Sequence, residues 1–320
     1  MGLIRGGSRE MFAVVAAGLA VLFCALAVPP AEAGISCRYV KAGPEGAVGN
    51  KLRIKVTRFE EVVALTPGPG KKIQVSDDQR MKPVRCRGGS PTMRNIDKVV
   101  FRVNRRATGS TLYVDRAPRF KPGARGYGGG DAGIRFELYG PSLSFGIGGT
   151  DGPDLIEMGA LGSSRLPGVD FASIAPGNFR TSGDNVDARI HARSANLLVK
   201  AGKGDDVVAG TLDYSQVAFV GPFPLSTSLY GEAGDDVLVG GRAQDYLDGG
   251  DGGDVLSGEG GRDELWGGPG LDELYGGPGN DLLDSQDRRG GEIDDCGEGH
   301  DLARMDLKDK DSNCEAFRFP

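Results

Sequence analysis

Hydrophobic residues follow one pattern in the first half of the 320-residue chain and another in the second. Between residues 34 and 147, short runs of β-branched and aromatic residues recur between turn-forming residues, with no helix-length periodic stretch among them. Runs of this kind predict strands. They are LRIKV, EVVAL, KIQV, KVVFRV, TLYVD, IRFEL and SLSFGI. Farther along, VDFASI, VDARI and NLLVK keep strand character at irregular spacing.

A strict nine-residue period replaces this pattern between residues 231 and 284, where six copies follow one another without a gap. The copies are GEAGDDVLV, GGRAQDYLD, GGDGGDVLS, GEGGRDELW, GGPGLDELY and GGPGNDLLD. Glycine holds the first position of every copy, aspartate the sixth and leucine the eighth. Glycine-rich acidic segments also serve as flexible linkers, but a linker has no reason to keep leucine and aspartate in a fixed phase.

The three fixed positions predict three structural roles. Glycine adopts φ > 0 without a Cβ clash, so the start of each repeat predicts a tight turn. Alternate side chains of a strand face opposite ways, which directs the eighth-position leucine into a core. Aspartate beside exposed turn carbonyls supplies hard oxygen donors, the ligands that calcium prefers. Each turn is therefore a candidate cation site.

The repeat resembles the RTX, or haemolysin-type, calcium-binding nonapeptide, whose pattern is G-G-x-G-x-D-x-U-x. The resemblance implies a right-handed parallel β-roll in which two nonapeptides form one coil. It also implies that calcium lies between stacked turns, held by aspartates and glycine-rich carbonyls, with about four ions among six repeats. The ligand candidates in the strict repeats are Asp236, Asp245, Asp254, Asp263, Asp272, Asp281, Gly231, Gly240, Gly249, Gly258, Gly267 and Gly276.

Stacking of alternate repeats would place Asp236, Asp254 and Asp272 on one edge of the coil. It would place Asp245, Asp263 and Asp281 on the other. Sheet rungs lie about 4.8 Å apart, so stacked aspartates repel one another unless a cation lies between them. We therefore expect the repeats to be largely disordered without calcium. The departures from the pattern are Ala243 at a fourth position and Glu232 and Glu259 at second positions, and these should weaken sites rather than remove the coil.

Degenerate copies extend the pattern in both directions. GTDGPDLIE places Asp154 in the sixth position, and AGKGDDVVA places Asp206 there. After an eleven-residue interruption that begins at Ser285, CGEGHDLAR returns to phase with Asp301. This cysteine-bracketed ending is similar to that of secreted, calcium-binding proteins of actinobacteria. We therefore expect a degenerate solenoid in residues 148–230, strict repeats in 231–284 and a cap in 285–320.

The first 33 residues predict export. Arg5 and Arg9 precede an apolar run that ends at the small-residue sequence of residues 31–33, which is typical of a signal peptide cleaved after Ala33. The alternative is an uncleaved anchor, because the apolar run is just long enough to span a bilayer. We expect no membrane span in the remaining chain, and an extracellular location.

Four cysteines remain after cleavage, an even number that predicts disulfides in an oxidising compartment. They allow three pairings. The short separations favour Cys37 with Cys86 and Cys296 with Cys314. A zinc site is the alternative, but CxxC spacing is missing.

Composition supports an all-β chain, because glycine accounts for 54 of the 320 residues and aromatic residues for only 7%. The net charge of −6 is unevenly distributed: residues 34–147 are rich in lysine and arginine, whereas carboxylates dominate from residue 231 onward. A basic face of the first part could hold an anionic cell-surface glycan or polymer. The alternative is an ordinary solvated strand face, and nothing in the sequence indicates nucleic-acid binding. The candidate residues are Arg102, Arg105, Arg106, Arg116, Arg119 and Lys121.

Catalytic motifs are missing from the sequence, which contains neither HExxH nor GxSxG. Its two histidines, His191 and His300, are expected on surface turns without a catalytic role. The pattern therefore indicates a secreted, non-enzymatic, calcium-binding β-roll that serves as a structural or adhesive module. The alternative is an extracellular glycan hydrolase or lyase, with its active site on the strand-rich part of residues 37–201 and the repeats as a stabilising tail.

Overall fold

The computed structural model describes residues 34–41, 50–92, 95–115, 134–161, 166–173, 188–210 and 222–318. These residues belong to one compact unit, Gly34–Pro320, and the expected signal peptide lies outside them. Within the described residues the one helical element is a short 3-10 turn, η1 (Pro69–Lys71), and all other regular structure is β. The prediction of an all-β fold is therefore confirmed. None of the described elements is a helix with the length and hydropathy that a bilayer crossing requires.

The strand-rich first part forms seven strands. They are β1 (Ile35–Val40), β2 (Lys51–Val56), β3 (Val62–Pro67), β4 (Ile73–Asp77), β5 (Lys82–Pro83), β6 (Lys98–Val103) and β7 (Ser110–Val114). β1 pairs with β2 in antiparallel fashion, as do β3 with β4 and β4 with β5. β2 pairs in parallel with β6, and β3 with β7. The predicted runs up to TLYVD each fall on one of these strands.

The middle of the chain contains longer strands than its sequence suggests. They are β8 (Arg135–Gly148), β9 (Asp154–Leu161), β10 (Leu166–Ser173) and β11 (Ala188–Lys203), followed by β12 (Val207–Ala209). IRFEL and SLSFGI, predicted as two strands, are the two halves of β8. The first half pairs with β6 and the second with β7, while β11 pairs along the length of β8.

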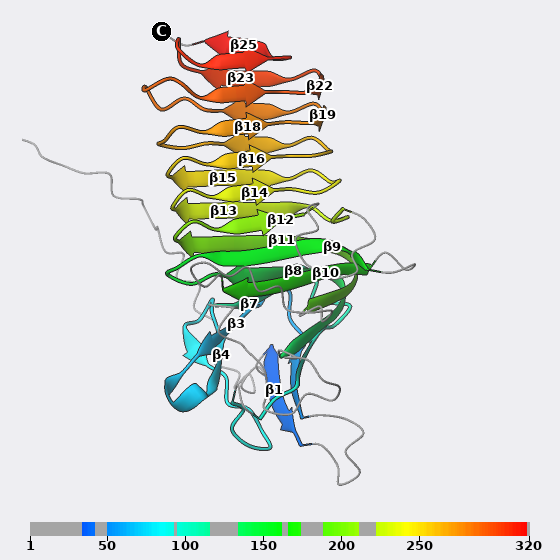
Figure 1. Cartoon of the computed structure of the whole chain (residues 1–320). Coiled ribbons are helices and arrows are strands. Elements are labelled where there is room, and N and C mark those ends of the chain that lie inside the picture. Colours follow the sequence, from blue (N-terminus) through cyan, green and yellow to red (C-terminus); the bar gives the residue numbers. More distant parts are fainter. Residues whose placement is uncertain are drawn as a thin grey trace, which may run out of the picture. The chain divides into compact units, whose positions relative to one another are not determined.

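Two parallel ladders carry the repeats (Figure 1). The first ladder continues from β11 through β13 (Thr227–Ala233), β15 (Tyr246–Asp251), β17 (Glu264–Trp266), β20 (Leu282–Asp284), β23 (Leu302–Met305) and β25 (Glu315–Arg318). The second ladder runs from β9 and β12 through β14 (Val237–Val239), β16 (Val255–Ser257), β18 (Glu273–Tyr275), β21 (Ile293–Asp295) and β24 (Lys310–Ser312). A small separate pair joins β19 (Pro278–Gly279) to β22 (Glu298–Gly299).

The register of the ladders places each repeat on the repeat two positions farther along, as a coil of two nonapeptides requires. Leu247 pairs with Leu265 in the first ladder, and Leu256 with Leu274 in the second. All six eighth-position leucines are fully buried. The predicted β-roll, with leucine as its core, is therefore confirmed.

The buried column of the first ladder is continuous with the strand-rich part of the chain. Each member pairs with the next, and all are fully buried; they are Leu65, Val114, Ile147, Val199, Leu229, Leu247, Leu265, Leu283 and Ala303. Irregular strands at the start of the coil thus supply the template on which the regular repeats stack.

Both favoured disulfides are present. Cys37 in β1 is bonded to Cys86, and Cys296 is bonded to Cys314 across the last coils. In the chain-entropy account, loops of these lengths contribute roughly 3 to 4 kcal/mol each. One bridge lies in the first part and the other in the cap, as predicted.

The second leucine column ends in an acidic residue. Asp294 takes the place of leucine above Leu274 and is fully buried. Its Oδ2 accepts a hydrogen bond of 2.7 Å from Ser285 Oγ, whereas its Oδ1 has no hydrogen-bond partner. Burial, opposed by the Ser285 hydroxyl, raises the pKa of Asp294 to about 7.

The second position has a left-handed backbone in five of the six strict repeats, Gly241 being the exception. Gly250, Gly268 and Gly277 have φ values of 104°, 101° and 91°. Glu232 and Glu259 adopt φ values of 76° and 69° at the same position, although a side chain there clashes with its own backbone. The departures noted in the sequence therefore preserve the turn but place strain in it.

Replacing one of these glutamates by glycine should stabilise the coil. We expect Glu259→Gly to raise the free energy of unfolding by about 0.5–1 kcal/mol, because relief of the left-handed strain exceeds the added chain entropy. Urea unfolding in calcium-containing buffer measures this difference. The matched control is Glu264→Gly, in the extended strand β17, which should lower the free energy of unfolding. A loss of stability in both variants would contradict the strain argument.

Candidate metal centres and a basic sheet face

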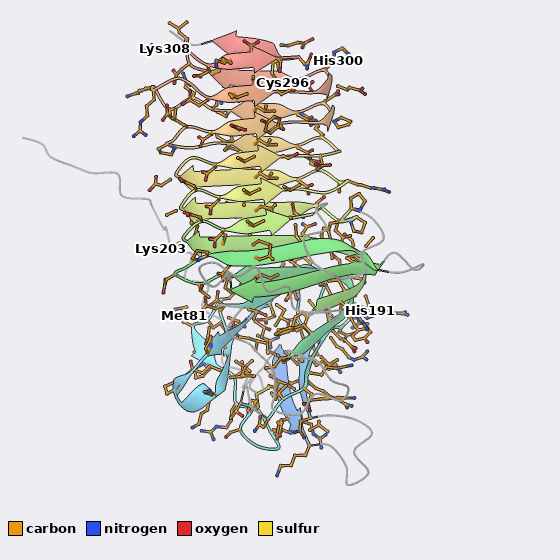
Figure 2. The ribbon with its side chains drawn as sticks, viewed as in Figure 1. Met81, His191, Lys203, Cys296, His300 and Lys308 are labelled. Atoms are coloured by element: carbon orange, nitrogen blue, oxygen red, sulfur yellow. A yellow bond between two sulfur atoms is a disulfide. The ribbon has the colours of Figure 1, made fainter. Side chains whose placement is uncertain are left out.

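The sixth-position aspartates lie at the two edges of the coil, where the chain passes between the ladders. Edge 1 contains the turns that end in Asp154, Asp206, Asp236, Asp254 and Asp272, and edge 2 those that end in Asp245, Asp263, Asp281 and Asp301. Lys203 and Lys308 mark edge 1 in Figure 2, and His300 marks edge 2. The structure thus gathers the same two groups of aspartates that the repeat spacing predicts.

One carboxylate oxygen of each aspartate fixes the stacking of the turns. The Oδ1 atom of Asp254 accepts a hydrogen bond of 2.8 Å from the backbone N–H of Asp236. Asp272 does the same for Asp254 at 2.9 Å, and Asp281 for Asp263 at 2.8 Å. The relay continues to Asp301, whose Oδ1 accepts from Asp281 N–H at 2.8 Å. Each aspartate therefore holds the turn of the coil before it.

The second carboxylate oxygen has no partner in most of these turns. It is buried and accepts no hydrogen bond in Asp206, Asp236, Asp254, Asp263, Asp272, Asp281 and Asp301. A buried carboxylate oxygen without a donor is costly unless a proton or a cation compensates it. The regular repetition of this unpaired atom is the clearest mark of a ligand site in the described part of the chain.

Exceptions occur at Asp154 and Asp245. Asp154 Oδ2 accepts from the Thr150 N–H at 2.5 Å, and Asp245 Oδ2 accepts from the Gly241 N–H at 2.7 Å. Asp245 stacks on Thr227, which donates from both its N–H and its hydroxyl to Asp245 Oδ1. In the first turn of edge 2, both carboxylate oxygens of Asp245 therefore already accept hydrogen bonds from the protein.

Space, rather than a left-handed backbone, explains the first-position glycine, which corrects the expectation from sequence. The first glycines of the six repeats do not have positive φ values. A Cβ on Gly240 would instead lie 2.6 Å from Asp245 Oδ2 and 2.8 Å from the carbonyl oxygen of Gly258. The same crowding of an aspartate oxygen and a carbonyl occurs at Gly231, Gly249, Gly258 and Gly276, and Gly267 meets the oxygen of Asp272. Glycine keeps open a cradle of oxygen atoms.

This cradle fits a hard divalent cation, since carboxylate and carbonyl oxygens are the donors that calcium takes. No three carboxylate, imidazole or thiol side chains converge on one point in the described residues. Each ion would accordingly take at most two carboxylates, with turn carbonyls and water completing its shell.

Burial raises the pKa of most of the edge aspartates. The pKa is about 8 for Asp206 and Asp263, about 7 for Asp254, and about 6 for Asp236, Asp245 and Asp272. The main cause in each case is desolvation, which backbone hydrogen bonds oppose. Without a cation, the folded coil therefore favours protonated Asp206 and Asp263 at neutral pH, and protonated Asp236, Asp245 and Asp272 only below about pH 6.

Two further residues continue edge 1 beyond the repeats, and the sequence analysis missed them. Ile293 N–H donates to Asp272 O at 3.0 Å and Lys310 N–H donates to Glu292 O at 3.0 Å, which places Glu292 and then Asp309 above Asp272. The turn that ends in Glu292 is two residues longer than those of the strict repeats, and Asp294 takes the position of the core leucine that marks the phase. One sequence feature could have identified Glu292, namely its distance from the start of the next repeat. Glu292 lies four positions before Cys296, just as Asp272 lies four positions before Gly276.

A second feature is a basic face on the outer side of β1, β2, β6, β8 and β11. Register brings its residues into rows, one of which contains Lys55, Arg102, Tyr139 and His191. The face contains Arg38, Lys51, Arg53, Lys55, Lys98, Arg102, Glu137, Tyr139, Arg189 and His191. His191 therefore lies in a strand, not on the surface turn expected from sequence.

Aromatic stacking orders one part of the basic face. The Tyr139 and His191 rings stack at 4.6 Å with an interplanar angle of 7°, and the Arg102 guanidinium lies 4.3 Å from the Tyr139 centroid. Glu137 accepts from Lys98 Nζ at 2.6 Å and from the Tyr139 hydroxyl at 2.9 Å. Of the residues named from sequence, Arg105 and Arg106 lie in the turn after β6, and Arg116, Arg119 and Lys121 lie outside the described residues.

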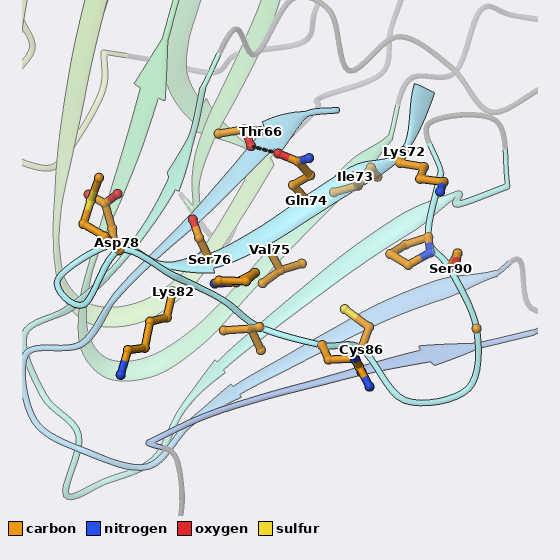
Figure 3. Close-up of a pocket in the computed structure, with 16 residues that line it drawn as sticks. Thr66, Lys72, Ile73, Gln74, Val75, Ser76, Asp78, Lys82, Cys86 and Ser90 are labelled. Atoms are coloured by element: carbon orange, nitrogen blue, oxygen red, sulfur yellow. Dashed lines mark hydrogen bonds between the residues drawn. The ribbon is translucent and has the colours of Figure 1, made fainter. Parts of the chain in front are cut away.

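A cavity of about 480 Å³ lies beside β4 and β5 (Figure 3). Cationic residues outnumber acidic ones in its lining, which includes Lys72, Lys82 and Arg85. Among the lining residues Asp78 is the one carboxylate. A glycosidase mechanism requires a pair of carboxyl groups, and this cavity does not supply one.

Comparison with known families agrees with the geometry. Residues 227–256 and 248–283 match the family model described as the RTX calcium-binding nonapeptide repeat, in four copies. This segment is therefore a calcium-binding RTX β-roll, and the resemblance noted in the sequence is confirmed. A search of curated proteins finds no matching relative.

The raised pKa values predict how stability changes with pH when calcium is removed. The six edge aspartates with a pKa of about 6 to 8 in the folded coil titrate near pH 4 in the unfolded chain. Their protonated form stabilises the fold, so this contribution is complete below about pH 4 and is lost as pH rises toward 8. We expect the thermal midpoint of the calcium-free protein to fall by on the order of 10 °C over this range.

Circular dichroism melts of metal-depleted protein at several pH values measure this fall. Saturating calcium should remove most of the slope, and calcium binding at pH 6 should release protons in calorimetry with buffers of different ionisation enthalpy. A midpoint that rises with pH in the absence of calcium would contradict the assignment.

Proposed function

We propose that this protein is a secreted, non-enzymatic module of structural or adhesive function, in which calcium along both edges holds the β-roll together. The observation that carries the proposal is the column of buried, unpaired aspartate oxygens, which in the strict repeats lie beside a glycine that leaves room for an ion. The RTX match to the same residues supports calcium as that ion.

The proposed ligands follow the unpaired atoms. They are the carboxylates of Asp206, Asp236, Asp254, Asp263, Asp272, Asp281 and Asp301, together with carbonyls of the first-position glycines Gly231, Gly240, Gly249, Gly258, Gly267 and Gly276. Asp154 and Asp245 are weaker candidates, because a backbone N–H occupies the corresponding oxygen of each. The strict repeats offer about four complete inter-turn positions, and the degenerate turns beside them offer more.

A bound divalent cation supplies positive charge between carboxylates that otherwise repel one another. At a dissociation constant of about 10⁻⁴ M and about 1 mM calcium, each site contributes on the order of 1.4 kcal/mol to folding. Several sites in one cooperative column would then decide whether the coil folds. The extracellular calcium concentration is the condition under which such weak sites fill.

Export is part of the proposal and has independent support. The two disulfides are stable in an oxidising compartment, and the first 33 residues have the pattern of a cleaved signal peptide. Weak calcium sites are also typical of extracellular modules.

The basic face supplies the proposed contact surface, for an anionic glycan or polymer. Neighbouring strands lie about 4.8 Å apart, so cations recur at close spacing on the adjacent strands β1, β2 and β6, and Arg189 lies on β11, beyond β8. Only Glu137 opposes them on this face, and Lys98 already pairs with it at 2.6 Å. Rows of cations beside a stacked tyrosine favour an extended polyanion over a small ligand in a pocket.

Calcium binding and folding should fail together when ligands are removed from both edges. The double variant Asp254→Ala, Asp263→Ala removes one unpaired carboxylate from each edge and should bind at least one ion fewer in calorimetric titration. We also expect the far-UV spectrum of the unaltered protein to lose β structure in chelator and regain it on calcium addition. Equal stoichiometry in both proteins would remove these residues from the ligand set, and identical spectra would contradict a structural role for calcium.

Polyanion binding should depend on the basic face. We expect Arg53→Glu, Arg102→Glu to elute from a heparin column, used as a sulfated-polymer probe, at clearly lower salt than the unaltered protein. The charge-matched control is Arg242→Glu, Arg262→Glu, in exposed turns of the β-roll, which should elute nearly unchanged. Equal shifts in both variants would show a response to net charge alone.

A further inference from the structure

The turn between β20 and β21 differs from every strict repeat. It spans residues 285–292, eight residues in place of six, and lies above the turn that ends in Asp272. The family match ends at residue 283, so this turn lies outside it. Carboxylates nevertheless gather here, at Asp287, Glu292, Asp306 and Asp309.

Glu292 is the central member of this group. Its residue is 1% exposed, and neither carboxylate oxygen has a hydrogen-bond partner. Among the described hydrogen bonds, the relay of the lower turns reaches Asp272, whose Oδ1 accepts from Asp254 N–H. No N–H or O–H group of the described residues donates to Glu292, whose carboxyl group lies within reach of that of Asp309.

Asp287 directs a third unpaired oxygen into the same turn. Its side chain is 5% exposed, its Oδ1 accepts from Arg289 N–H at 2.7 Å, and its Oδ2 has no hydrogen-bond partner. Asp287 lies close enough to Glu292 and to Asp272 for its charge to raise the pKa of both. The guanidinium of Arg289 is 3.5 Å from Asp287 Oδ2 but is 66% exposed, so solvent screens that pair.

The other two carboxylates accept backbone hydrogen bonds that fix the turn, and Asp309 also lies against Glu292. Asp309 accepts from the N–H groups of Gly291 and Asp306, at 2.8 and 2.5 Å. Asp306 accepts from Arg288 N–H at 2.5 Å and from Asp287 N–H at 3.1 Å. These bonds fix the backbone of the turn around the oxygens that remain unpaired.

We propose that Glu292 and Asp287 form a divalent-cation site of the calcium class in the C-terminal cap, separate from the sites of the strict repeats. Glu292 would bind through both oxygens and Asp287 through Oδ2, with carbonyls of the 285–292 turn and water completing the shell. A bidentate glutamate of this kind is a familiar calcium ligand. Two carboxylates can hold such an ion when carbonyls and water supply its other ligands. This number agrees with the observation that no three acidic, histidine or cysteine side chains converge in the described residues.

A protonated Glu292 is the competing account. Burial, and then the neighbouring Asp309, raise the pKa of Glu292 to about 8, so a proton shared with Asp309 could compensate the buried group without an ion. The two accounts differ in the number of ions that the protein binds.

Equilibrium dialysis against calcium chloride at pH 8.5 separates these accounts. We expect the unaltered protein to bind one more ion than Glu292→Gln, and Asp287→Asn to weaken the same site by at least about tenfold. The matched control is Glu298→Gln, an exposed glutamate in the next turn, which should keep the full number. An unchanged count in Glu292→Gln overturns the site.

The strict repeats provide an independent comparison. Asp254→Ala, Asp263→Ala should lose ions that Glu292→Gln retains, and the combined variant should lose both sets. If Asp254→Ala, Asp263→Ala binds as many calcium ions as the unaltered protein and Glu292→Gln binds fewer, the proposed repeat ligands are wrong and the cap site is supported. If Glu292→Gln binds the full number and the repeat variant binds fewer, only the cap site is overturned.

A measurement on the unaltered chain covers the case in which a variant does not fold. Hydrogen exchange of the peptide that spans residues 285–292 should slow by about tenfold at free calcium ten times the dissociation constant. Exchange in this peptide at the same rate with and without calcium overturns the proposal.

Discussion

The structure depends on the stacking of like-charged carboxylates at the spacing of a β-sheet. Each edge aspartate uses one oxygen to hold the backbone of the previous turn and leaves the other buried without a donor. The first oxygen fixes the spacing of the turns through its hydrogen bond. The second oxygen destabilises the stacked turns, because it is buried without a hydrogen-bond donor. A fold built in this way is stable only when protons or cations occupy its edges, so folding and ion binding are one equilibrium.

The hydrophobic core sets the register but does not resolve this conflict. A continuous buried column runs from Leu65 in β3 to Ala303 in β23, so the repeats stack on a preformed irregular base. That base carries the basic face and the first disulfide, and it has ordinary strand pairing. Calcium dependence should therefore concentrate in the regular coils, while the first part of the chain retains its own means of stability.

The repeat period predicted the stacking, the two edges and the leucine core, because a fixed phase of glycine, aspartate and leucine has one simple packing solution. The separations of the cysteines indicated the pairing that the structure shows. Other features depend on contacts that local sequence does not encode. IRFEL and SLSFGI merge into β8 because different strands pair with each half, and His191 joins the basic face because β11 continues through it. Glu292 and Asp309 escaped notice because the turn lengthens at the same place where Asp294 replaces the leucine that marks the phase.

Asp294 has a consequence for how the coil ends. The last strand of a parallel ladder with a hydrophobic core leaves backbone groups and apolar side chains unpaired. Another copy of the chain can stack on such a strand, as in fibrils. Here the last two levels of the second ladder carry Asp294 and Asp311 where the levels below carry leucine, and a disulfide joins Cys314 to Cys296. The leucine column is thus not continued to the last level of the second ladder, which makes that level a poorer template for stacking of another copy.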